Sequence, residues 1–121
     1  MRVLLVVLSL MMAGKGVASE LSCEDVSSLN AIQADNPLVR VAPEYPNKGT
    51  QSPVPGCAVL TFSLDRSESA STPKSIEVEY ETENRFGKAA KRALSKWLYL
   101  NKNVPESDRY YMVFHFELSD S

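Results

Sequence analysis

The chain has 121 residues, which is enough for one small domain and excludes a multidomain enzyme. Its 13 basic and 15 acidic residues give a formal net charge of −2 at pH 7. A mildly acidic chain has no general attraction for polyanions, so we expect neither nucleic acid nor an anionic membrane surface as a partner.

The first 19 residues have the pattern of an export signal. Arg2 precedes an apolar run at 3–13 that only Ser9 interrupts, and small residues follow up to Ser19. As a helix this run rises about 16 Å, which is too short for a hydrocarbon core of about 30 Å. We therefore expect residues 1–19 to be a cleaved signal peptide and the protein to be periplasmic. If the segment is retained, it anchors the protein in the inner membrane.

Two cysteines, Cys23 and Cys57, follow the signal. In an oxidising compartment an even count predicts a disulfide, with free thiols or half of a metal site as the alternatives. His115 is the only other soft ligand and lies far along the sequence, so we expect no metal. Closing this loop destabilises the unfolded chain by roughly 3–4 kcal/mol. We predict that the disulfide holds residues 20–39 as an N-terminal arm.

The next elements are predicted from prolines and hydrophobic periodicity. Five prolines between 37 and 55 exclude regular structure there, except for a short extended piece at 38–41. Residues 58–64 and 76–80 alternate apolar and polar side chains, which predicts two strands joined by a loop at 65–74. We expect one face of these strands to form the core and the other to be mostly polar.

An amphipathic helix is predicted from about Asn84. Its apolar side chains follow the spacing i, i+3, i+4, i+7, i+8 and i+11 and are Phe86, Ala89, Ala90, Ala93, Leu94 and Trp97. Residues 110–118 alternate again and predict a third strand. The predicted fold is therefore α+β: a two-layer sandwich of order β-β-α-β, with a three-stranded antiparallel sheet covered on one face by one amphipathic helix.

No enzymatic site is expected. Nucleophilic catalysis needs a base beside the nucleophile, and the single histidine, His115, falls on the polar side of a strand. The alternate glutamates at 77–83 are interpreted as a soluble strand face rather than a glycosidase acid pair or a cation site. The basic residues at 88–96 are interpreted as a solvated helix face, because no exposed aromatic side chains accompany them for base stacking. We expect no catalytic residue, cofactor or metal.

Three motifs in order carry a resemblance. They are Tyr45-Pro46, Gly56 at the start of the first strand, and Trp97-Leu98-Tyr99 at the end of the helix. In this order they resemble the C-terminal domain of TonB, the periplasmic energy transducer of Gram-negative outer-membrane transport. The resemblance makes residues 40–121 a TonB C-terminal-like domain. The chain departs from the family in lacking its long Pro-rich spacer, and in having Asn101 where the family commonly has proline.

The resemblance implies a binding mode. In the family the last strand pairs with the TonB box, a short N-terminal segment of an outer-membrane transporter, and the Tyr-Pro region also meets the transporter. The edge of a sheet suits this role because it presents unpaired N–H and C=O groups. The predicted partner-binding residues are Arg40, Val41, Ala42, Pro43, Glu44, Tyr45, Pro46, Tyr110, Tyr111, Met112, Val113, Phe114, His115, Phe116, Glu117 and Leu118.

We therefore expect a periplasmic protein-binding module linked to energised transport across the outer membrane. One alternative is a short TonB energy transducer whose N-terminal segment remains as an inner-membrane anchor. Another is an exported structural or inhibitor-like domain that shares only the fold, since a fold does not determine function. Exposed sheet edges also permit a homodimer by strand exchange.

Overall fold

A computed structural model describes residues 20–46 and 53–117 of the chain. The predicted signal peptide and Leu118 lie outside these residues. Within them, no helix is long and apolar enough to span a membrane. The elements in chain order are β1 (Ile32–Gln33), β2 (Gly56–Arg66), β3 (Ala70–Glu81), α2 (Asn84–Leu94), β4 (Tyr99–Leu100), the 3-10 helix η2 (Asn101–Asn103) and β5 (Tyr110–Phe116).

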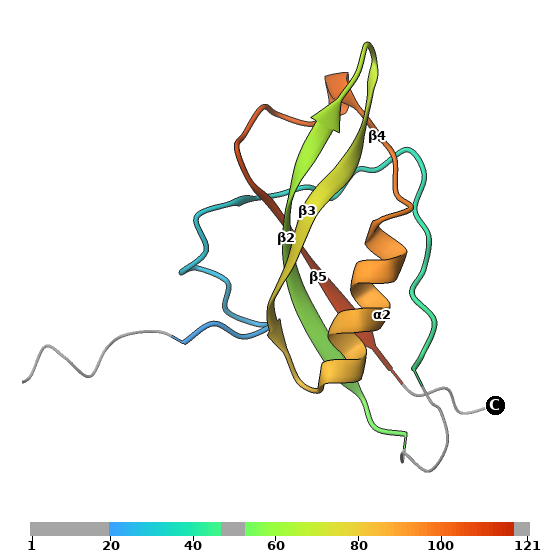
Figure 1. Ribbon diagram of the computed structural model, residues 1–121. Helices are drawn as coiled ribbons and strands as arrows, with labels where there is room; N and C mark the ends of the chain where they lie inside the picture. The colour runs from blue at the N-terminus through green and yellow to red at the C-terminus, as the bar shows by residue number, and fades with distance from the viewer. Residues whose placement is uncertain (1–19, 47–52, 118–121) are drawn as a thin grey trace, which may run out of the picture.

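The sheet has five strands in the order β1-β5-β2-β3-β4 and curls into a half-barrel (Figure 1). β1 is parallel to β5, while all other neighbouring strands are antiparallel. The predicted three-stranded antiparallel sheet is therefore wrong. The three predicted strands correspond to β2, β3 and β5, but the predicted loop at 65–74 is wrong, because β2 extends to Arg66 and β3 begins at Ala70. The sheet also gains a two-residue strand at each edge. Two residues are too few to show an alternating pattern, so neither β1 nor β4 leaves a signal in the sequence.

The central strand β2 is buried on both faces. Ala58, Leu60 and Phe62 belong to the main core, as predicted. On the opposite face Cys57 and Val59 are also buried, with exposed fractions of 8% and 0%. The expectation of a mostly polar second face is wrong for this part of β2, because the N-terminal segment covers it.

From here on, the name arm is used for residues 20–36, the first part of the predicted arm at 20–39. It lies on the side of the sheet away from α2 (Figure 1) and is joined to β2 by the Cys23–Cys57 disulfide. The two Cα atoms are 6.5 Å apart. This bond agrees with the pairing expected from the sequence. Around it a second, smaller apolar cluster forms from Val26, Leu29, Val59, Tyr80 and Val113.

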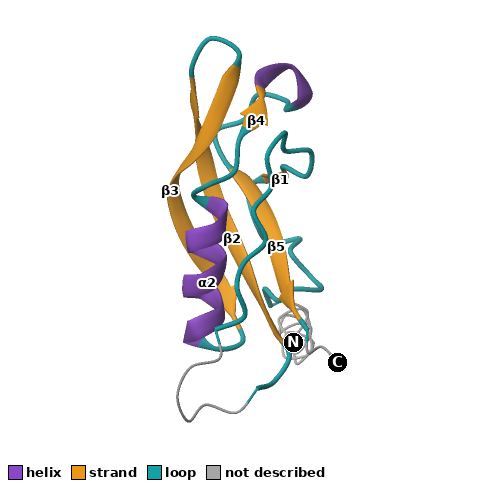
Figure 2. Ribbon diagram, turned by 90° about the vertical axis from the view of Figure 1, so that its right-hand side faces the viewer, coloured by secondary structure: helices purple, strands orange, loops and turns teal. Residues whose placement is uncertain are grey.

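The main core is covered by two elements. α2 packs over β2 and β3, and residues 37–46, which we call the strap, run between α2 and β5 (Figure 2). The indole Nε1 of Trp97 donates a hydrogen bond of 2.9 Å to the Val41 carbonyl, and Val39 pairs with Leu98. Trp97 is 3% exposed and Phe86 is 0% exposed, which confirms that both are buried. The helix alone does not close the core, because the curled sheet is wider than one helix.

Candidate functional site

The outer edge of β5 is only partly occupied. β1 pairs with its first two residues, Tyr110 and Tyr111. The backbone N–H groups of Ile32 and Ala34 donate 3.2 Å hydrogen bonds to the carbonyls of Arg109 and Tyr111. Beyond this point the arm leaves the edge, and the remaining five residues of β5 extend past it.

Val113 and His115 direct their backbone groups to the same outer side as Tyr111, because alternate residues of a strand face the same way. The pairing with β2 supports this assignment. His115 lies opposite Cys57, whose own carbonyl accepts from the N–H of Thr82 on the far side of β2. Among the described residues, no backbone group pairs with Val113 or His115 on the outer side. These two residues form the free edge of β5.

A pocket of about 210 Å³ lies between this edge and the strap. The strap contributes Arg40, Ala42 and Pro43, Trp97 joins them, and β5 contributes residues 112–115. The Arg40 guanidinium carbon lies 5.1 Å from the centroid of the Trp97 ring. The structure therefore brings together part of both predicted contact regions, residues 40–46 and 110–118, at one place.

The predicted binding residues of β5 have different roles in the structure. Tyr110, Met112, Phe114 and Phe116 point into the core and are at most 7% exposed. Tyr111 and Val113 are half-buried on the arm side, and His115 and Glu117 are exposed. A partner therefore has access to the backbone edge at 113–117 and to few side chains.

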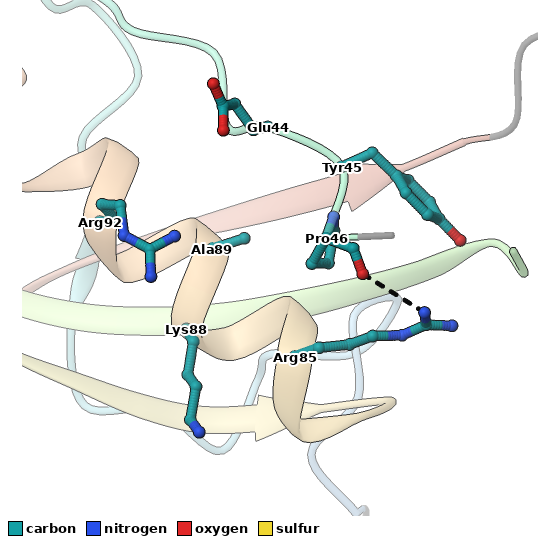
Figure 3. Close-up of a pocket in the computed structure, with 7 residues that line it drawn as sticks. All are labelled: Glu44, Tyr45, Pro46, Arg85, Lys88, Ala89 and Arg92. Carbon is teal, nitrogen blue, oxygen red and sulfur yellow. Dashed lines mark hydrogen bonds between the residues drawn. The ribbon is translucent and has the colours of Figure 1, made fainter. Parts of the chain in front are cut away.

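The Tyr45-Pro46 motif supports the structure of the strap. The Tyr45 ring meets Phe86 edge-on with centroids 5.8 Å apart, and its hydroxyl donates to the Val54 carbonyl. The Pro46 carbonyl accepts a 3.3 Å hydrogen bond from Arg85 of α2 (Figure 3). Arg85 also forms a 2.7 Å ion pair with Glu83. These contacts fix the strap against the start of the helix.

On its other side the strap borders a groove along α2. Pockets of about 200 and 160 Å³ share Glu44, Ala89 and Arg92. The groove also carries Lys88 and Lys96, which the sequence presents as part of a solvated helix face. Sequence reasoning missed the groove because a hollow exists only where the strap lies beside the helix, and the strap has no periodic pattern.

The acidic row on β3 is partly engaged by other side chains. The Thr61 hydroxyl donates a 2.6 Å hydrogen bond to the Glu79 carboxylate, and Glu77 lies 3.6 Å from Arg109. The arrangement fits a structural and solubilising face. In the part of the chain that the structure describes, no group of histidine, cysteine and acidic side chains is placed to hold a metal ion.

Comparison of the chain with protein-family models, with curated proteins and with solved structures finds no match. These comparisons do not test the resemblance of the short motifs to TonB C-terminal domains.

Proposed function

We propose that the protein is a periplasmic binding module that takes up an extended segment of a partner protein as an added strand on β5. The partner expected from the TonB-like motifs is an outer-membrane transporter presenting its TonB box. The observation that carries the proposal is the free edge of β5, where Val113 and His115 direct N–H and C=O groups outward without a backbone partner among the described residues.

The pocket beside this edge supports the same mode of binding. A strand added at 113–117 places alternate side chains against the strap, where the pocket between Arg40, Pro43 and Trp97 has room for one of them. The strap wall is held by the Trp97–Val41 hydrogen bond, so little ordering is needed on binding. Main-chain hydrogen bonds supply most of the recognition. Binding should therefore tolerate changes in the side chains of the peptide.

The other long edge strand, β3, is less suited to this role. β4 covers Ala70 and Ser71, and Pro73 lies two residues after Ser71. Ser75 has a φ of 52°, and the pairing with β2 shifts register beside it. An irregular edge with proline and a row of glutamates is the usual protection against strand addition. Past the two residues that pair with β1, β5 has no proline and no row of glutamates.

The test removes one backbone donor at the free edge. In His115→Pro the edge loses the N–H of residue 115, while the bonds between β5 and β2 stay, because residue 115 faces away from β2. His115→Ala keeps the N–H and is the matched control. TonB-box peptides are titrated into labelled protein while backbone amide shifts are followed. We expect shifts at 113–117 in the parent and in His115→Ala, and their loss in His115→Pro.

Two results would contradict the proposal. One is equal peptide binding by the proline and alanine variants. The other is the absence of shifts at 113–117 with a panel of transporter-derived peptides, which would favour the exported structural or inhibitor-like alternative.

A further inference from the structure

The groove between the strap and α2 has one cationic wall. We call it the cationic groove and define it by Lys88, Arg92 and Lys96 on the helix side and by residues 41–46 on the strap side. In Figure 3 Arg92 lies beside Ala89 on α2, while Lys88 extends from the side of the helix away from the strap and therefore borders the groove only at its outer margin. Arg92 borders both pockets and is therefore the central cation.

The three cations have no acidic partner among the described residues. The ion pairs there are Arg85 with Glu83 and Arg109 with Glu77. Lys88, Arg92 and Lys96 are exposed. In a chain of net charge −2 this is a local concentration of positive charge. A hollow with walls of low dielectric strengthens the field of such charges, which a flat helix face does not do.

The shape of the groove favours a thin, extended ligand. Its floor includes Ala89 and Ala93, each 4% exposed, so the bottom of the groove is closed by small, buried side chains. Lys88 and Arg92 are four residues apart on α2, which corresponds to about 6 Å along the helix, and Lys96 follows four residues later, just beyond the end of α2. Alternate side chains of an extended peptide are separated by about 6.6 Å. Carboxylates at every second position of such a peptide therefore match the spacing of the cations.

We propose that the cationic groove binds an acidic segment of a partner protein, in extended conformation, with carboxylates at alternating positions. Glu44 on the strap wall disfavours binding of a continuous polyanion such as a phosphate backbone, because every position of that polymer is charged and one charge would lie next to the carboxylate. A peptide places an uncharged residue opposite Glu44. The Tyr45 ring packs on Phe86, which leaves it less suited to stacking on a nucleic-acid base.

The proposal is independent of the β5 edge, because the strap lies between the two sites. The strap wall is fixed by hydrogen bonds from Trp97 to Val41 and from Arg85 to Pro46. The groove therefore exists before the ligand arrives, and binding needs little rearrangement.

The experiment uses two synthetic peptides of equal composition, one with glutamate at every second position and one with the same glutamates in a single block. Each is titrated into the labelled full chain at low salt. We expect the alternating peptide to bind more tightly and to shift the amides of Glu44, Ala89 and Ala93. Arg92→Gln should weaken its binding roughly tenfold, because a charge-assisted contact is lost. Lys91→Gln removes the same charge from an exposed helix position outside the groove and is the matched control, with an effect of about twofold at most.

Several results would overturn the proposal. Equal losses in Arg92→Gln and Lys91→Gln would indicate general charge attraction rather than a groove. Equal binding of both peptides would remove the spacing argument. Tighter binding to vesicles containing anionic lipid than to the alternating peptide would assign the surface to a membrane, and no binding at all would exclude a site. A chain that binds this peptide and no TonB-box peptide supports the groove and contradicts the proposed strand addition.

Discussion

At the scale of single residues, the packing around Gly56 explains why this position holds glycine. A Cβ atom there would lie 2.2 Å from one carbon of the Phe86 ring and 2.4 Å from another. Phe86 is completely buried and packs against the rings of Tyr45 and Phe116, so a shift of its ring disturbs both contacts. Glycine at position 56 is therefore required by the close packing between the start of β2 and the start of α2.

Gly56→Ala should destabilise the protein by about 1–3 kcal/mol, because overpacking forces a buried ring or the backbone to shift. Urea denaturation measures the change in the free energy of unfolding. Replacing Phe86 by leucine in the alanine background should recover part of the loss, since the two positions are in direct contact. If the two changes are simply additive, the clash with the ring is not the cause.

We expect the protein to lose stability at alkaline pH because Tyr99 is buried in its protonated form. Its side chain is 0% exposed, its hydroxyl donates a 2.8 Å hydrogen bond to the Ala34 carbonyl, and burial raises its pKa above the usual 10.0. A raised pKa means that the folded state holds the proton more tightly than the unfolded state. The stability from this proton is complete below pH 10 and decreases as the pH rises above it. Tyr99→Phe should lower stability at neutral pH and flatten the alkaline decrease, measured by urea denaturation across pH 8 to about 11. The same alkaline slope in both proteins would assign the effect to another group.

At the scale of elements, length decides what the sequence could predict. β2, β3, β5 and α2 each contain at least seven residues, which is enough for a period of 2 or 3.6 to be recognised. The burial of Phe86 follows directly from the helical period. Trp97 lies three residues beyond the end of α2, where its indole N–H donates to the Val41 carbonyl of the strap. β1 and β4 have two residues each and depend on neighbours far along the chain. The sequence predicts a strand at 110–118, which corresponds to β5, but the pairing of its first two residues with β1 could not be predicted because β1 leaves no pattern.

The disulfide between the arm and β2 should stabilise the fold, and its removal should affect the arm first. Replacing Cys23 and Cys57 by serine should destabilise the protein by roughly 3–4 kcal/mol, because the bond closes a loop with a sequence separation of 34. The arm should also detach first, so the amides of Ile32 and Ala34 should exchange with solvent faster than those of α2. Hydrogen exchange and urea denaturation measure the two effects. Unchanged exchange at Ile32 and Ala34 would show that β1 is held without the bond.

At the scale of the whole molecule, one continuous run of chain surrounds β5. The arm lies on one face, β1 on the edge, and the strap on the other face (Figures 1 and 2). This wrapping creates both hollows, one between the strap and β5 and one between the strap and α2. The sequence shows which residues are apolar and which are charged, but not which of them a wrapped segment brings together. For this reason the cationic groove could be identified only from the structure and not from the sequence.

The pairing of β1 with β5 has a consequence for how the protein reaches its folded state. Ile32 lies opposite Tyr110, so the first strand of the sheet cannot pair until the last one is available. β2 also lacks one of its two neighbours until then. A chain emerging from its N-terminus cannot complete its sheet stepwise, and pairings of such long separation are slow to form. While the chain is being made, the early segments therefore stay unpaired, and folding should finish only after the whole chain has been released.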